Sequence, residues 1–144
     1  MEKMYVFYTD DDPDDISIFS DAVKAASNEV QLLTQFDGGD LLRLLQNPPP
    51  RPGMIFLDWN MPGKNGAEVL GEIKSHPKLI EIPIIIFSTS ENQEDIDCAF
   101  RLKADRFITK PNSFKEIIQI IKHCLTLDWE NISRKEEDFV FKLN

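Results

Sequence analysis

The chain has 144 residues, of which 42% are hydrophobic and 28% charged, so it is long enough to form one globular domain with a full core. Its formal net charge of -9 disfavours nucleic acid or an anionic membrane surface as the main partner. No apolar run approaches the roughly 20 residues of a membrane-spanning helix, and the two cysteines share no metal-ligand spacing with either histidine.

Five short apolar segments alternate with five amphipathic segments along the chain. The apolar segments have the length and composition of β-strands and cover residues 4–9, 30–35, 54–58, 84–88 and 106–109. The amphipathic segments predict helices over residues 13–26, 39–46, 66–75, 92–102 and 113–127. Regular alternation of this kind predicts an α/β fold, a parallel sheet covered by helices on both faces. Met1–Lys3 leave no room for a signal peptide, so we expect a cytoplasmic protein.

An acidic turn follows the first predicted strand, with aspartates at positions 10, 11, 12, 14 and 15. Pro13 suits the first position of a helix, and Asp12 suits the residue that caps it. Carboxylates crowded at the end of a strand repel one another and need a compensating cation. A hard divalent metal with oxygen ligands is the natural candidate.

Start and stop signals support the other predicted helices. Capping-box spacing occurs three times, in the pairs Asn65 with Glu68, Ser90 with Gln93, and Ser113 with Glu116. The proline-rich segment 48–52 must end the second helix, because proline has no backbone N–H and clashes with the preceding turn.

Polar groups gather where the carboxyl ends of the strands meet, the edge at which doubly wound sheets form their sites. Asp10 and Asp11 follow the first strand, and Asp58 ends the third. Ser88 ends the fourth strand and Lys110 follows the fifth. The three acids can hold one Mg²⁺, and a carboxylate that contacts this metal is a candidate nucleophile toward phosphorus. Lys110 would offset charge on the phosphoryl oxygens, and Ser88 could donate a hydrogen bond to them.

Four segments at these strand ends resemble, in order and spacing, the signature blocks of response-regulator receiver domains. They are Thr9–Pro13, Phe56–Gly63 with Gly66, Phe87–Ser90 and Thr109–Pro111, and the resemblance spans about residues 4–127. It implies a doubly wound, flavodoxin-like sheet of order 2-1-3-4-5. It also implies a phosphoprotein of two-component phosphorelay signal transduction, with no enzymatic activity beyond self-catalysed phosphotransfer and autodephosphorylation. The implied partners are a sensor histidine kinase or phosphotransfer protein and a downstream protein.

The same resemblance assigns roles to single residues. Asp58 matches the phosphoacceptor, and Lys110 matches the amine that pairs with the phosphoryl group. Asp11 and Asp58 match the direct Mg²⁺ ligands, with the backbone carbonyl of Asn60 as the third protein ligand. Asp10 matches the acid that reaches the metal mainly through water.

Ser88 and Phe107 match the family's hydroxyl and aromatic switch pair, although the ring here lacks the hydroxyl of the tyrosine that is common at that position. Lys103 stands where the family usually has glycine, so the backbone there is strained if it needs a positive φ. The resemblance also implies a cis bond between Lys110 and Pro111.

Two alternatives use the same residues. In a haloacid-dehalogenase-like, metal-dependent phosphohydrolase the nucleophile is in an Asp-x-Asp motif after the first strand. Asp10 and Asp12 would form that motif here. Pro13-Asp14 replaces the threonine or valine that usually continues this motif, and there is no cap domain, so this alternative is disfavoured. An adaptor that works unphosphorylated is disfavoured by the intact acids and Lys110. If the chain is a receiver domain, the remaining aspartates of the turn, at positions 12, 14 and 15, are interpreted as capping and surface charge.

Residues 128–144 lie outside the family pattern, so we divide the chain into a receiver domain, 1–127, and a C-terminal extension, 128–144. The extension is too apolar for a disordered tail, with Trp129, Ile132, Phe139, Val140, Phe141 and Leu143. We expect it to pack on its own domain or on a partner. The last predicted helix has a second apolar stripe that needs cover, which makes a homodimer a further hypothesis.

Overall fold

The computed structural model describes residues 3–143, so Met1, Glu2 and Asn144 of the expected domain bounds lie outside the described residues. The strands are β1 Met4–Thr9, β2 Val30–Gln35, β3 Met54–Leu57, β4 Ile84–Ser88 and β5 Arg106–Thr109. The helices are α1 Pro13–Ala26, α2 Gly38–Gln46, α3 Gly66–Lys74, α4 Gln93–Arg101 and α5 Phe114–Thr126, followed by a short 3-10 helix over Glu136–Asp138. Each predicted strand and helix is present, with bounds that differ by at most one residue at either end.

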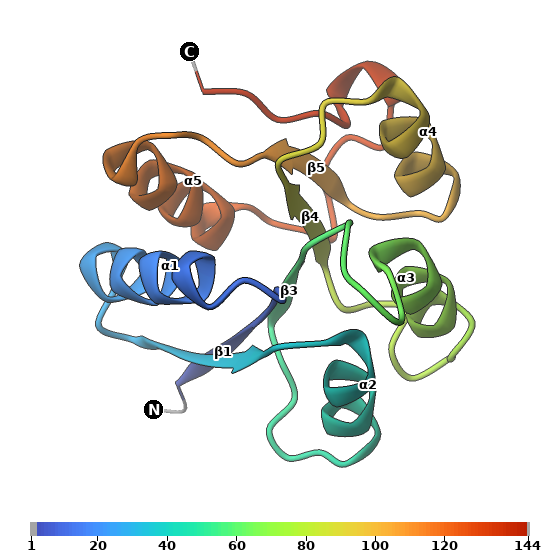
Figure 1. The fold of residues 1–144 in the computed structure, drawn as a ribbon, viewed down its shortest axis with the longest axis horizontal. Coiled ribbons are helices and arrows are strands. Elements are labelled where there is room, and N and C mark those ends of the chain that lie inside the picture. The colour runs from blue at the N-terminus through green and yellow to red at the C-terminus, as the bar shows by residue number, and fades with distance from the viewer. Residues whose placement is uncertain (1–2, 144) are drawn as a thin grey trace.

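The five strands form one parallel sheet in the order β2-β1-β3-β4-β5, which confirms the predicted fold class. Helices α1 and α5 lie side by side on one face, and α2, α3 and α4 cover the other (Figure 1). Strand β1 pairs with both β2 and β3, so the chain reverses its direction of winding at β1. The carboxyl ends of β1 and β3 are therefore neighbours at the point where doubly wound sheets form sites.

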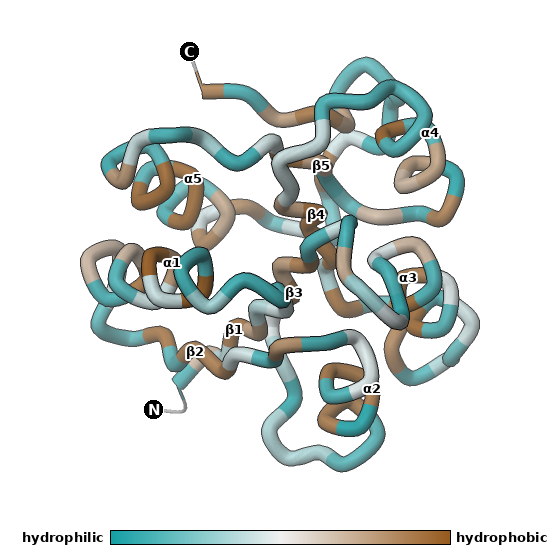
Figure 2. The backbone as a smooth tube through the Cα atoms, in the orientation of Figure 1, coloured by the Kyte–Doolittle hydropathy of each residue, from teal (hydrophilic) through white to brown (hydrophobic). Residues whose placement is uncertain are grey.

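The strands are buried on both faces, as expected for a parallel sheet between two helical layers. All residues of β3 and β4 are buried, and Figure 2 shows hydrophobic residues along the strands and on the sheet side of the helices. Successive strand residues enter opposite cores: Phe7 packs with the α2–α4 side and Tyr8 with the α1–α5 side. On the latter side the Tyr8 ring stacks on Phe19 with a centroid distance of 4.1 Å.

Three of the helix caps follow the sequence prediction, among them Ser113 at the start of α5, and one does not. Asp12 caps α1 by accepting a hydrogen bond from the Asp14 amide, and Asn65 with Glu68 forms the predicted reciprocal capping box. The prediction that Ser90 caps α4 was wrong, because Asn92 takes that position. Asparagine is at least as good a cap as serine, and it lies directly before the first helical residue.

Two backbone predictions near β5 have opposite outcomes. Lys103 has a φ of +69°, so the turn between α4 and β5 does require the left-handed conformation that glycine adopts more easily. The predicted cis bond before Pro111 was wrong. The cis bonds within residues 3–143 are Pro48–Pro49 and Pro49–Pro50. The two isomers of a bond before proline differ by only about 0.5–1 kcal/mol, so local packing decides between them.

After α5 the chain returns across the molecule and runs along the outer edge of β5 (Figure 1). The Phe107 amide donates to the Phe139 carbonyl over 3.1 Å, and the Phe141 amide donates to the Phe107 carbonyl over 3.0 Å. Phe107 and Val140 thereby form a parallel bridge. Trp129 contributes a second anchor, because its indole N–H donates to the Cys124 carbonyl over 3.0 Å. Residues 139–141 thus pair with the outer edge of β5.

Candidate functional site

The turn after β1 holds Asp10 and Asp11 in different environments. The Asp10 amide continues the sheet by donating to the Gln35 carbonyl over 3.1 Å, and the Asp10 side chain is buried. The Asp12 amide donates to Asp10 Oδ1 over 3.0 Å, which fixes the carboxylate as the chain turns into α1. Asp11 is exposed at the same turn. One acid is therefore locked into the sheet and the other is free to face a ligand.

Asp58 directly follows β3 and is buried against the neighbouring loop. Its amide donates to the Thr9 carbonyl over 3.0 Å, and its Oδ1 accepts a hydrogen bond from the Trp59 amide over 2.9 Å. Gly66 makes this loop possible, since a Cβ there would lie 2.7 Å from the Asp58 carbonyl oxygen. The start of α3 and the Asp58 loop therefore approach more closely than any side chain at position 66 would permit.

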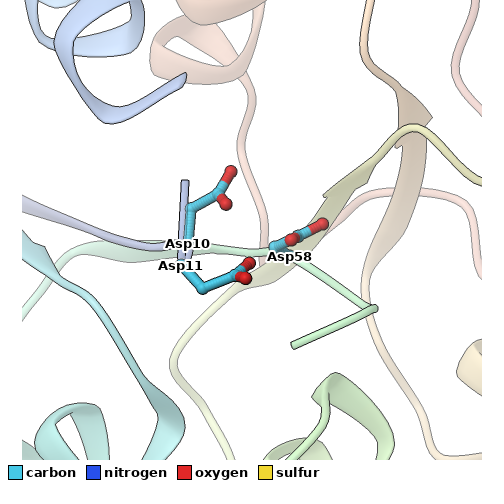
Figure 3. Close-up of side chains that lie close together, drawn as sticks. All are labelled: Asp10, Asp11 and Asp58. Carbon is cyan, nitrogen blue, oxygen red and sulfur yellow. The ribbon is translucent and has the colours of Figure 1, made fainter. Parts of the chain in front are cut away.

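The carboxylates of Asp10, Asp11 and Asp58 converge, with one oxygen from each within 4.8 Å of the others. Figure 3 shows the three side chains beside one another, two from the turn after β1 and one from the segment after β3. Burial raises the pKa of Asp58 to about 7; the negative charges of Asp10 and Asp11 act in the same direction, and Lys110 opposes them. A cluster of oxygen donors that carries this electrostatic cost fits a hard divalent cation.

Lys110 is the cationic residue of the protein that lies against these carboxylates. Its amide donates to the Ser88 carbonyl over 2.8 Å, which fixes it beside the end of β4. Its ammonium group donates to Asp10 Oδ2 over 2.6 Å and to Asp15 Oδ2 over 2.9 Å, and lies 3.7 Å from Asp58 Oδ1. Burial alone would lower the pKa of Lys110, but the acceptors on Asp10, Asp58 and Asp15 outweigh it and raise that pKa. The interpretation of Asp15 as surface charge was wrong, because it shares this lysine.

Tyr8 belongs to the site although its position in a strand indicates only a core aromatic. Its hydroxyl donates to Asp10 Oδ2, the oxygen that also receives Lys110. Burial, and then the charge of Asp10, raise the pKa of Tyr8 well above its ordinary value, so it stays a donor. Both oxygens of Asp10 are therefore occupied by groups of the protein.

Ser88 and Phe107 lie on adjacent strands, and both are fully buried. Ser88 Oγ accepts a hydrogen bond from the Ser90 amide over 3.2 Å. The Phe107 ring lies 6.4 Å from the Phe139 ring, measured between centroids, so the aromatic of the predicted switch pair contacts the C-terminal extension. Asn60 lies in the exposed part of the loop after Asp58, and its carbonyl as a metal ligand stays a prediction.

Comparison with known proteins gives one consistent family. Residues 6–122 match the family described as the response regulator receiver domain. The chain is 30% identical to the response regulator Rcp1 of Synechocystis sp. over 122 residues, which cover 81% of this chain and 83% of that protein. Among solved structures it is similar to the phosphorylated cyanobacterial phytochrome response regulator RcpA, with 33% identity, a TM-score of 0.77, and coverage of 85% of this chain and 91% of that one. The Mn²⁺-bound form of Rcp1 has 27% identity, a TM-score of 0.77, and coverage of 90% and 97%. Within residues 3–143, no helix combines the length and apolar character needed to cross a bilayer.

Proposed function

Since this chain belongs to the response-regulator receiver domain family and is a phosphoacceptor module of two-component signalling, we propose that Asp58 is the residue that accepts the phosphoryl group. The observation that carries the assignment is which carboxylate oxygens already accept hydrogen bonds from the protein. Asp58 Oδ1 is held by the Trp59 amide, whereas no described residue donates a hydrogen bond to its Oδ2. Both oxygens of Asp10, in contrast, accept hydrogen bonds from the protein. Asp58 is the buried acid of the cluster with a free nucleophilic atom.

In the proposed reaction Asp58 Oδ2 attacks the phosphorus of a phosphohistidine on a sensor kinase or phosphotransfer protein. An O–P bond forms and the P–N bond breaks. The electron pair goes to the imidazole nitrogen, which is protonated as it leaves. Lys110 is 3.7 Å from Asp58, close enough to transfer from Asp10 and Asp15 to the oxygens of the incoming group. Ser88 is proposed to donate its hydroxyl hydrogen to the same group, and Phe107 to respond to that movement.

We assign Mg²⁺ to the cluster, with Asp11 and Asp58 as direct ligands, Asp10 mainly through water, and the Asn60 carbonyl as a further ligand. The metal would supply charge neutralisation for the phosphoryl oxygens during transfer. Three clustered carboxylates and the raised pKa of Asp58 support this assignment. Receiver domains bind Mg²⁺ or Mn²⁺ at an acidic pocket, and the Mn²⁺-bound form of Rcp1 is one of the similar structures.

The test is labelling by a small phosphodonor. Acetyl phosphate with 10-fold excess EDTA over protein-bound metal should leave the chain unlabelled, and restoring Mg²⁺ should give one phosphoryl group per chain by mass spectrometry. The mass increase should disappear in hydroxylamine, which cleaves acyl phosphates and spares phosphoesters. Labelling that is equally efficient in EDTA would contradict the metal assignment.

Mg²⁺ affinity should depend on pH in a defined direction. A proton on Asp58 competes with the metal, and the pKa of this carboxyl is about 7, so the affinity should fall by up to about tenfold for each pH unit below 7. Trp59 is buried and adjacent to Asp58, so its fluorescence reports binding, measured in a Trp129→Phe background that removes the other indole. Equal dissociation constants at pH 6 and pH 8 would contradict the prediction.

We further propose that residues 1–127 act as the receiver unit and 128–144 as an extension of it, since the family match ends at residue 122. A downstream protein partner and a homodimer both remain predictions. A phosphohydrolase that uses Asp10 is not favoured, because Tyr8, Lys110 and the Asp12 amide occupy both oxygens of that residue.

A further inference from the structure

A second cleft lies at the opposite end of the sheet from the acidic cluster, beside the amino end of β5. It has a volume of about 540 Å³ and is lined by α4, the turn that follows it, the end of α3 and the C-terminal extension. Six basic residues surround it: Lys74, Arg101, Lys103, Arg106, Arg134 and Lys135. These are six of the 16 basic residues of a chain whose net charge is -9. The cleft is therefore locally positive in a protein whose net charge is negative.

One carboxylate, Asp105, lines the cleft, and its hydrogen-bonding capacity is already used. Asp105 is buried, its Oδ2 accepts the Ile84 amide over 2.7 Å, and its Oδ1 accepts Arg134. Lys74 lies 3.8 Å from the same carboxylate. Asp105 is thus a structural group that positions two of the six cations, and it leaves the other four without a carboxylate in the lining.

Those four cations have no ion pair with a described residue. Within residues 3–143 no salt bridge involves Arg101, Lys103 or Lys135, and Arg106 donates only to the carbonyls of Asp105 and Ser133. Burial and then the charge of Arg134 lower the pKa of Arg106, against a smaller opposing effect of Asp138. Cations crowded into one cleft repel one another, and an anion from outside the chain would stabilise them.

The remaining lining is apolar. Phe100 and Phe139, whose rings pack edge to face with a centroid distance of 5.2 Å, line the cleft together with the exposed Ile80. The cleft therefore has both cationic and apolar residues in its lining, and its volume lies within the range of small-molecule sites. Three of the six cations are arginines, whose planar guanidinium groups match the oxygens of a phosphate.

We propose that this cleft binds a small organic phosphate of nucleotide size, with its phosphates against the basic residues of the lining and its apolar or aromatic body on Ile80, Phe100 and Phe139. Arg134, Lys135 and Phe139 belong to the extension, while Lys74, Arg101 and Lys103 belong to the domain. A ligand here contacts both parts and so favours the state in which the extension is docked. The site is separate from the acidic cluster and requires no phosphorylation of Asp58.

The proposal is tested by titrating the full chain calorimetrically with ATP, AMP and pyrophosphate in EDTA, so that no Mg²⁺ can carry a nucleotide to the acidic cluster. ATP should bind. Pyrophosphate should bind at least about tenfold more weakly, because it has no apolar or aromatic group to contact Ile80, Phe100 and Phe139. A double variant, Arg101→Gln with Lys135→Gln, should weaken ATP binding by at least about tenfold.

The matched control is Lys122→Gln, which removes one exposed cation from α5, away from the cleft, and should leave ATP affinity unchanged. Lys103→Gly offers an independent variant, because glycine accepts the positive φ at this position and removes the charge without backbone strain. It should weaken ATP binding at least threefold while keeping the fold. Absence of ATP binding at millimolar concentration, equal affinity in the variants, or equal binding of ATP and pyrophosphate would each overturn the proposal.

Discussion

Asp58→Asn should abolish labelling by acetyl phosphate in Mg²⁺ and, in the same protein, raise the stability of the metal-free fold. The amide oxygen is a far weaker nucleophile than a carboxylate, and no other acid of the cluster combines burial with a free oxygen. Mass spectrometry after incubation with acetyl phosphate measures the first effect, for which we expect a loss of more than about 1000-fold in rate.

The stability effect has a sign that depends on pH. The pKa of Asp58 is raised to about 7 in the folded chain from 3.8, so between these values the folded state holds a proton that the unfolded state has lost. The free energy of unfolding therefore has no penalty from this carboxyl below about pH 4. It decreases as the pH rises from there through 7, by up to about 4 kcal/mol in total. Asparagine carries no charge and removes this loss. Urea denaturation in EDTA should show the variant to be more stable at pH 8 and equal to the wild type near pH 4.

The matched control for both measurements is Asp12→Asn. Asp12 caps α1, and asparagine caps as well as aspartate does, so labelling should persist and the pH dependence of stability should resemble that of the wild type. Label that remains on Asp58→Asn would overturn the assignment of the phosphoacceptor. A variant that lost label and also lost stability at pH 8 would refute the electrostatic account of this carboxyl.

Phe139→Ala should release the C-terminal extension from β5. The Phe139 side chain is 2% exposed and packs against Phe100 and Phe107. Truncating a buried phenylalanine costs about 3–5 kcal/mol, but here the extension can detach, so the free energy of docking sets the upper limit of the measured loss. Hydrogen exchange of the Phe107 and Phe141 amides, which bond the two segments together, should accelerate by at least about tenfold.

Lys142→Ala is the control for this change, because it lies in the same segment with an exposed side chain. It should leave exchange of the Phe107 and Phe141 amides at the wild-type rate. If both amides stayed protected in Phe139→Ala, other contacts, such as those of Trp129 with Cys124 and of Arg134 with Asp105, would hold the extension. The aromatic packing at position 139 would then carry little of the docking free energy.

Several parts of the site followed from sequence because they depend on the backbone. Parallel strands place their carboxyl ends together, so the meeting of Asp10 and Asp11 with Asp58 required only correct strand ends. The left-handed turn at Lys103 was suggested only by the resemblance, because the family usually has glycine there, and the φ of +69° shows that this backbone does need it.

Contacts that depend on side-chain direction across long sequence separations could not be predicted. Lys110 reaches Asp15, which is 95 residues away. The contact of the Tyr8 hydroxyl with Asp10 is local in sequence, but it too depends on where the side chain points. Hydrophobic patterning likewise indicated that the extension would pack on its own domain or on a partner, but not that Val140 would pair with β5. Periodicity identifies an apolar face and does not specify what covers it.

The bridge between Phe107 and Val140 has a consequence for any protein that recognises this edge of the sheet through its backbone. The Phe107 amide and carbonyl are already paired, so an incoming strand must displace a segment of the same chain. A tethered competitor of this kind acts at an effective concentration on the order of millimolar. A partner that binds β5 alone must therefore compete with the docked extension. A partner that also binds the released extension recovers part of that cost, so recognition of β5 and the extension together is favoured.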